Sequence, residues 1–543
     1  MLKKFLLFEQ KFTITKAAAI VGFFALLSKF VALVRDPLFT SKFGGDQIYI
    51  LDIYNAAFRV PDFIFSIFIL GTLSVALIPI FVDIMVKDEN RARDFANTII
   101  TLTMLSMGGI FILLYIFSWQ ITKLLVPGFT PEMLTETVGL TRIIILAQII
   151  FTLSNVCTNI LYSYKRFIIA GIAPILYNLG IILGILVFYP RFGISGLGYG
   201  VLLGAAGHLL IQLPELGRST FRLLPAWKLH DPAIKKFFKL YLPRIFAIDL
   251  PVFSLLISTF IASRFEAGSI GIFTLSINLL SLPVSIIALS LATAIFPALS
   301  EAYAKNQELI FLDMLKKAFV QILYFMIPLT LLMLIFRAQG VRLYLGHGKF
   351  TWENTILTFN TFGVLAFSLI SQSLAPILSR AFYSRQNTII PVSINLMALA
   401  LNACLAFAFK DHYGIIGIAA AFSVASIFNA VTLFVVLRAV LYKDSKNYEA
   451  LKKFDDGLVL TAVKIILASI AMALTCHEGL YLLEPLLNTH TVIGLLIQVG
   501  CSAFLGVVVF FIVSTLLKLK ESQIILDYIK KIISSILPNE KIS

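Results

Sequence analysis

The sequence predicts an all-α, polytopic membrane protein with about fourteen transmembrane helices, each about 20 residues long. Of its 543 residues, 59% are hydrophobic and 13% are charged, and its mean hydropathy is +0.94. No class of soluble globular domain has this composition. Apolar runs long enough to cross a ~30 Å hydrocarbon core recur from one end of the chain to the other. In order, the predicted spans are 14–34, 49–84, 95–118, 136–160, 166–189, 193–213, 237–262, 269–297, 316–337, 356–380, 388–409, 413–438, 457–476 and 491–517.

Basic residues are concentrated in every second connection between the spans. Two of these connections are KDENRARD (87–94) and the long segment 214–239. Cytoplasmic loops carry an excess of Lys and Arg, so the bias predicts that both termini lie in the cytoplasm. The same bias accounts for the net charge of +15 without a nucleic-acid partner. The four cysteines show no CxxC or Cys/His spacing, so we expect no disulfide framework, no metal site and no cofactor.

The chain repeats itself at a spacing of about 220 residues. LYSYKRFIIAGIAPILYNLG (161–180) resembles FYSRQNTIIPVSINLMA (382–398), and LSVALIPIFVDIMVK (73–87) resembles LATAIFPALSEAYAK (291–305). Because six spans separate the copies, both halves enter the membrane from the same side. We therefore expect two six-helix lobes related by a pseudo-twofold axis along the membrane normal. The predicted domains are an N-terminal lobe (1–225), a C-terminal lobe (226–445), and an extra span pair with a basic cytoplasmic tail (446–543).

A polar stripe follows the second predicted span. Asp52, Asn55, Arg59, Asp62 and Ser66 stand at i, i+3, i+7, i+10 and i+14, which is one face of an α-helix. Two interpretations compete. The charges pair with one another to hold helices together, or they line a wet cavity between the lobes. A stripe four turns long exceeds what one salt bridge needs, which favours the cavity.

Other spans add polar residues to the predicted cavity. Span 1 contains Lys29, Arg35 and Asp36, and Pro37 is expected to end that helix. Span 7 contains Arg244 and Asp249, and span 8 contains Asn278. A charge at the bilayer centre costs about 2.5–3.5 kcal/mol on insertion scales, so these groups need a partner, water or a ligand.

No enzyme motif is evident in the sequence. GLGYGVLLGAAG (196–207) has GxxxG spacing inside a span, which indicates close helix packing and not a phosphate loop. We interpret His208 in the same span as a packed or hydrogen-bonded histidine.

Four stretches resemble the MurJ (MviN) family, the lipid II flippases of the exporter superfamily (MOP) that also holds MATE drug exporters and polysaccharide flippases. They are VRDPLFTSKFG with Asp52 and RVPDF; PGFT with the APILYNLGIILG…GISGLGYGVLLGAAGHLLIQLP block; LPRIFAIDLPVFSLLISTFIAS with INLLSLP…FPALS; and SRAFYSRQNTIIPVSINL. The resemblance covers residues 14–440.

The resemblance implies roles for particular residues. Arg35, Asp36, Asp52 and Arg59 correspond to the family's charged cavity residues, and Lys29 stands where the family commonly has a basic residue. Asn178 and Arg244 match a span 5 asparagine and a span 7 Pro-Arg. The extra span pair would form a lateral groove for a long lipid tail.

The sequence also departs from the family pattern. Phe65, Ser66 and Leu70 occupy the region where the family often has a second span 2 arginine, and Asn278 replaces a span 8 arginine. This cavity is therefore poorer in charge than the usual one.

These observations predict a non-enzymatic flippase in the bacterial cytoplasmic membrane. It would move a lipid-linked peptidoglycan precursor (lipid II) from the inner to the outer leaflet by alternating access, with Na⁺ or H⁺ as a possible coupling ion. Alternatives are a flippase for another polyprenyl-diphosphate glycan, an ion-coupled small-molecule exporter of the same superfamily, a membrane glycosyl transferase, or a non-transporting scaffold.

The charge bias generates a topology test. A cysteine placed at position 90 should react with a membrane-impermeant thiol reagent only from the cytoplasmic side, and one in GHGKFTWE (346–353) only from outside. Labelling of position 90 from outside alone would overturn the orientation.

Overall fold

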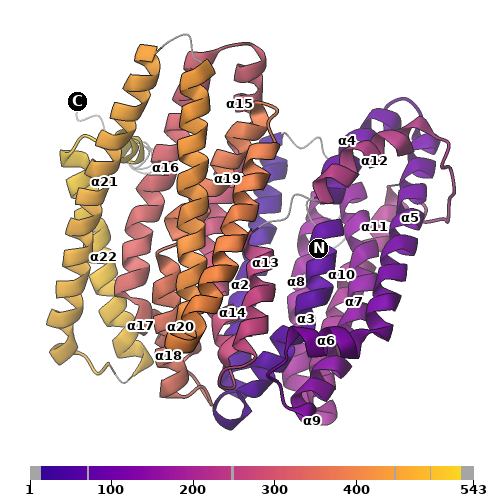
Figure 1. Ribbon diagram of the computed structural model, residues 1–543, viewed down its shortest axis with the longest axis horizontal. Helices are drawn as coiled ribbons and strands as arrows, with labels where there is room; N and C mark the ends of the chain where they lie inside the picture. The colour runs from indigo at the N-terminus through magenta and orange to yellow at the C-terminus, as the bar shows by residue number, and fades with distance from the viewer. Residues whose placement is uncertain are drawn as a thin grey trace, which may run out of the picture. The chain divides into compact units, whose positions relative to one another are not determined.

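The computed structural model describes residues 14–69, 72–219, 221–245, 250–444, 448–489 and 491–527. Every regular element in these ranges is a helix (Figure 1), which confirms the all-α prediction. The chain divides into two compact units, Met1–Gly271 with Gly348–Phe350 and Ile272–His347 with Thr351–Ser543.

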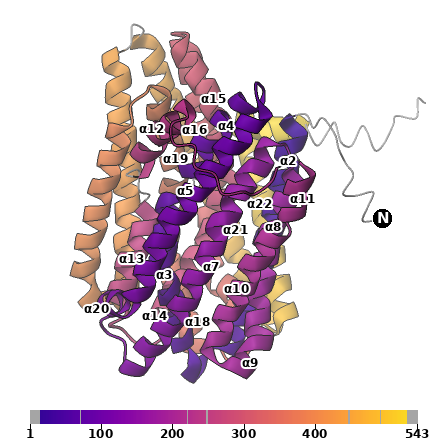
Figure 2. The same cartoon turned by 90° about the vertical axis from the view of Figure 1, so that its right-hand side faces the viewer.

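The first unit contains α2 (Ile14–Lys42), η1 (Gly45–Gln47), α3 (Tyr49–Phe68), α4 (Thr72–Met85), α5 (Glu89–Ile116), α6 (Ser118–Leu125), α7 (Pro131–Ser163), α8 (Phe167–Leu183), η2 (Gly184–Phe188), α9 (Tyr189–Phe192), α10 (Ile194–Leu210), α11 (Leu213–Arg218), α12 (Pro232–Ile245) and α13 (Leu250–Ala262). In this unit α7 packs against α3, α5 and α10, and α8 packs against α2 and α10 (Figure 2).

Helix α14 (Ser269–Pro283) crosses the boundary between the units. Its residues up to Gly271 belong to the first unit, and the rest belong to the second. It is followed by η3 (Val284–Leu289), α15 (Ser290–Ala304), α16 (Glu308–Ile335), α17 (Arg337–Leu345), α18 (Trp352–Ala366), α19 (Leu369–Ser384), α20 (Ile389–Asp444), α21 (Tyr448–Leu483), η4 (Glu484–Leu486) and α22 (Val492–Leu516). In this unit α16 packs against α19 and α21, and α21 packs against α22. Since α12 and α13 belong to the first compact unit, the predicted lobe boundaries stay a prediction.

Nine helices in the described residues are long and apolar enough to cross a membrane, or ten if the pair α18–α19, bent by 40°, is one span. One of them, Ile389–Lys443, has 55 residues and would be about 80 Å long if straight. Gly414, with φ 53°, breaks it where two spans were predicted, at 388–409 and 413–438. The count of fourteen spans stays a prediction.

The prediction that Pro37 ends the first helix is wrong. Helix α2 continues through Pro37 to Lys42, which is consistent with the tolerance of membrane helices for internal proline. At its end, the Lys42 ammonium donates to the carbonyl oxygen of Ile185 at 2.5 Å and lies 5.3 Å from the Tyr189 ring centroid. Arg35 therefore lies inside the helix, two turns before its end.

The internal repeat is visible in how helices end and begin within each unit. Lys165 (φ 60°) and Gln386 (φ 61°) are both in the left-handed region and follow α7 and α19. Their N–H groups donate to the carbonyls of Tyr162 and Tyr383 in the same motif. The threonines at 130 and 351, also 221 positions apart, cap α7 and α18 through their hydroxyls. Equivalent sequence positions thus adopt equivalent local structure.

The segment that follows α11 is held along α5 by side-chain hydrogen bonds. The Asn97 amide donates to the carbonyl of Arg222 at 3.0 Å and accepts from the N–H of Leu224 at 3.3 Å. The Arg91 guanidinium binds both carboxylate oxygens of Asp231 at 2.9 and 2.8 Å. These hydrogen bonds hold the pKa of Asp231 below its ordinary value, so the pair persists on acidification until Asp231 is protonated.

Glycines bring α8 and the following η2 into backbone contact with α10, which confirms the GxxxG prediction. A Cβ added at Gly200 would collide with the Cα of Gly184, and one added at Gly180 would collide with Gly204. The two backbones therefore approach as closely as glycine permits.

This contact generates a stability test. We expect Gly200→Ala to lower the free energy of unfolding by about 1–3 kcal/mol, because it overpacks a backbone contact. The matched control is Gly109→Ala in α5, where nothing lies within 4 Å of the added methyl group; it should stabilise the helix by about 0.5–1 kcal/mol. The unfolding midpoints of the purified proteins measure both changes, and equal midpoints would contradict the packing role.

Candidate functional site

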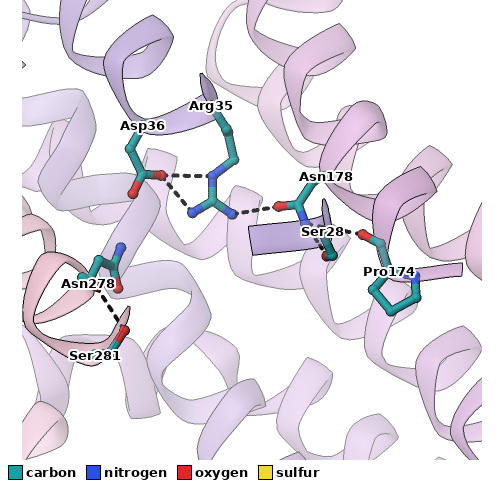
Figure 3. Close-up of polar contacts among 7 residues, drawn as sticks. All are labelled: Ser28, Arg35, Asp36, Pro174, Asn178, Asn278 and Ser281. Carbon is teal, nitrogen blue, oxygen red and sulfur yellow. Dashed lines mark hydrogen bonds and ion pairs between the residues drawn. The ribbon is translucent and has the colours of Figure 1, made fainter. Parts of the chain in front are cut away.

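Arg35 on α2 is the centre of a polar cluster (Figure 3). Its Nε and Nη2 donate to one carboxylate oxygen of Asp36, at 2.9 and 2.6 Å, and its Nη1 donates to the Asn178 amide oxygen at 3.2 Å. The Asp36 residue is 8% exposed, while the Arg35 side chain is 23% exposed. The pair is electrically neutral, and part of the Arg35 side chain stays exposed.

Asn178 on α8 holds Arg35 from the other side. Its amide nitrogen donates to the Ser28 hydroxyl at 3.3 Å and to the Pro174 carbonyl at 3.1 Å. These two acceptors turn the amide so that its oxygen faces the arginine. Arg35, Asp36 and Asn178, which the sequence singled out on two distant spans, therefore lie together.

Asp52 is the most buried member of the α3 stripe, 3% exposed. Its two carboxylate oxygens accept the backbone N–H groups of Gly268 and Gly271, at 2.6 and 2.8 Å. These N–H groups belong to the first turn of α14, where a carboxylate satisfies otherwise unpaired donors and the positive end of the helix dipole. This position gives Asp52 a structural role in the fold.

The next residues of the stripe have partners on other helices of the first unit. Arg59 Nε donates to the Thr259 hydroxyl of α13 at 2.9 Å. Asp62 is exposed and accepts from the Gln148 amide of α7 at 2.5 Å. Asn55 donates to the carbonyl of Leu51 in its own helix at 2.7 Å.

The remaining predicted site residues are Lys29, Asn278, Arg244 and Asp249. Lys29 is exposed on α2. Asn278 lies on α14 in the second unit, where its backbone carbonyl accepts from the Ser281 hydroxyl at 2.8 Å (Figure 3). The side chain of Arg244 and the whole of Asp249 lie outside the described residues.

Sequence reasoning missed the uncharged partners Ser28, Gln148 and Thr259. Gln148 is 5% exposed and Thr259 is 1% exposed, and each binds a charged member of the stripe. The signal for Gln148 was available, because it is a lone amide in the apolar run IIILAQIIF (143–151). Ser28 and Thr259 gave no comparable signal, since hydroxyl side chains are common in membrane helices.

The prediction that His208 is a hydrogen-bonded core histidine is confirmed. Its Nδ1 lies 2.6 Å from the Ser154 hydroxyl and 3.2 Å from the Gln212 amide nitrogen. The Gln212 amide also donates to Ser154 at 2.8 Å. This network joins α7 to α10 within the first unit.

The N–H donors of Arg35 that Asp36 and Asn178 do not use are suited to bind an anion. A guanidinium has five N–H donors, and three are used by Asp36 and Asn178. Within the described part of the chain, two donors have no hydrogen-bond partner. Planar pairs of such donors match phosphate oxygens.

A sequence model described as "Lipid II flippase MurJ" matches residues 41–499. The chain is 28% identical over 515 residues to a probable lipid II flippase MurJ of Rickettsia prowazekii, covering 93% of this chain and 98% of the relative. It is 26% identical over 506 residues to the corresponding protein of Buchnera aphidicola subsp. Acyrthosiphon pisum, covering 92% and 96%.

The fold is similar to that of solved transporters. A structure of lipid II flippase MurJ in an inward closed conformation matches with a TM-score of 0.73 and 22% identity, covering 92% of this chain and 98% of that one. An inward-facing MATE multidrug transporter matches with a TM-score of 0.62 and 16% identity, covering 77% and 96%. These likenesses confirm the predicted exporter fold.

The two stripe carboxylates should differ in their effect on stability. Asp52→Asn removes one of two oxygens that accept backbone N–H groups, and we expect a loss of about 1.5–3 kcal/mol in the free energy of unfolding. Asp62→Asn is the control, because it retains an acceptor for the Gln148 amide. Thermal unfolding followed by size-exclusion chromatography compares them, and a larger loss for Asp62→Asn would contradict the assignment.

Proposed function

Because the chain belongs to the MurJ family of lipid II flippases, we propose that it moves lipid II from the inner to the outer leaflet of the bacterial cytoplasmic membrane by alternating access. The single observation in the structure that supports this most directly is Arg35, a half-buried arginine with N–H donors left over after it binds Asp36 and Asn178. Lipid II carries a pyrophosphate at its headgroup end, which is the ligand such donors fit.

In this proposal Arg35 and Arg59 bind the pyrophosphate, and Asp36 and Asn178 position the Arg35 guanidinium. Asp36 keeps the site neutral when it is empty, which lowers the cost of an arginine at membrane depth. Lys29, Asn55, Asp62, Arg244 and Asn278 remain candidate ligand contacts. Asp52 contributes by holding the Gly268–Gly271 turn.

Coupling to a Na⁺ or H⁺ gradient is the finer part of the proposal. Asp62 supports it, because this residue is exposed and, among the described residues, a hydrogen bond reaches one of its two carboxylate oxygens, from Gln148. A carboxylate with a free oxygen can take up a cation. We also propose that both termini are cytoplasmic, as the basic connections indicate.

The second candidate is a flippase for another polyprenyl-diphosphate glycan. It is favoured by the departures from the family pattern, Phe65 and Asn278 in particular, because fewer basic groups would face the ligand. Both candidates share the pyrophosphate and differ only in the glycan.

The arginines provide the test. We expect Arg35→Ala and Arg59→Ala each to abolish transport in vesicles loaded with fluorescent lipid II, with little loss of folded protein, because each removes a guanidinium that binds the pyrophosphate. Arg59→Lys keeps the charge but loses the planar fork, so it should transport poorly.

The control separates ligand binding from structural pairing. Thr259→Val removes the hydrogen bond to Arg59 but keeps the guanidinium, and it should retain most transport. The double variant Asp62→Asn with Arg59→Gln removes both charges. If that protein is stable and fully active, the arginine serves only as a partner for the acid and the pyrophosphate model fails.

A further inference from the structure

A cavity of about 610 Å³ lies within the second unit. Its walls come from the end of α16, from α17, and from the hairpin formed by α21 and α22. None of its lining residues belongs to the proposed pyrophosphate site.

Two arginines of α17 line this cavity, Arg337 and Arg342, together with one carboxylate, Glu484. Arg337 gives one hydrogen bond to the Leu334 carbonyl at 2.8 Å. The Arg342 guanidinium lies 6.0 Å from the Trp352 ring centroid. In the described ranges no ion pair joins Glu484 to either arginine, so most of the guanidinium donors are available to a ligand.

A buried polar atom provides a second, independent sign of a ligand. Gln339, also on α17, lines the cavity, and its amide oxygen is buried without a hydrogen-bond partner among the described residues. Leaving a buried acceptor unpaired is unfavourable. A ligand that brings a hydroxyl donor next to the arginines would satisfy it.

The surroundings of the cavity are those of a membrane–water interface. Helices α16 and α21 both end at it, and its aromatic residues Trp352 and Tyr481 are 59% and 72% exposed. Such aromatic side chains are typical of the headgroup level. On other faces of α22, which lines the cavity through Leu495 and Gln498, Ile493 and Leu496 are 71% and 54% exposed and offer an apolar surface to acyl chains.

We propose that this cavity binds the headgroup of an anionic glycerophospholipid, of which phosphatidylglycerol is the fitting example. The lipid phosphate contacts Arg337 and Arg342, a glycerol hydroxyl donates to Gln339, and the acyl chains lie along α22. In the predicted orientation this lipid belongs to the outer leaflet. The assignment does not rest on the proposed transport function.

The three tryptophans supply the reporter and its control. A chain with Trp119→Phe and Trp227→Phe keeps only Trp352, at the cavity. A chain with Trp227→Phe and Trp352→Phe keeps only Trp119, 41% exposed on α6, the short helix that occupies the equivalent place in the first repeat. Spin-labelled lipids quench tryptophan fluorescence at short range.

The probe is spin-labelled phosphatidylglycerol, titrated into the purified full chain in neutral detergent and compared with spin-labelled phosphatidylcholine. We expect quenching of Trp352 to saturate at an about tenfold lower mole fraction of the anionic lipid, with no such preference at Trp119. Equal quenching of Trp352 by the two lipids overturns the proposal.

Two variants that should change the preference for anionic lipid in opposite directions test the assigned contacts. Arg337→Gln with Arg342→Gln should abolish the preference, whereas Glu484→Gln should strengthen it by removing the acid that opposes the phosphate. If the double variant does not fold, Glu484→Gln decides alone. A retained preference in a folded double variant, or no gain in Glu484→Gln, overturns the proposal.

A soluble competitor distinguishes a lipid from a free phosphate ester. Millimolar glycerol 3-phosphate should leave the quenching of Trp352 by phosphatidylglycerol unchanged, because it lacks the acyl chains. Reversal of the quenching would assign the cavity to a soluble phosphate ester and refute the lipid.

Discussion

Hydrocarbon offers no hydrogen-bond partner, and the rest of this structure follows from that constraint. A backbone that crosses the bilayer must satisfy its own N–H and C=O groups, which leaves the helix as the element of choice. Hydroxyl side chains also find their acceptors within their own helices, at the carbonyl four residues earlier. Thr141 donates to the carbonyl of Thr137 at 2.7 Å, and Thr358 donates to that of Asn354 at 2.6 Å. Interruptions occur where glycine allows them, as at Gly414.

The same constraint makes each charge in a span informative. Asp52 uses both oxygens on backbone N–H groups, so it has little capacity for a ligand. Among the described residues, Arg35 and Asp62 keep donors or acceptors without a hydrogen-bond partner. The charged residues of α2 and α3 therefore differ: Asp52 holds a backbone turn, whereas Arg35 and Asp62 are the residues proposed to bind.

Arg35 and the pair Arg337 and Arg342 are stabilised near lipid in different ways. Arg35 lies inside a helix and is neutralised by the adjacent Asp36, so it depends on a specific partner. Arg337 and Arg342 lie on a short helix at the ends of spans, where long basic side chains reach the interface. The first arrangement suits a ligand that enters and leaves, and the second suits a lipid that stays.

The sequence by itself determined the membrane class, the all-α fold, the repeat and the family, because hydropathy, helical spacing and motif order are local properties of the chain. It also placed Arg35, Asp36 and Asn178 in one site. It could not predict that α2 continues through Pro37, that Asp52 caps the first turn of α14, or that Gln148 and Thr259 are the partners of Asp62 and Arg59. Only the tertiary structure decided these points, because the hydrogen-bond partner of a buried polar group is set by which distant helix packs against it.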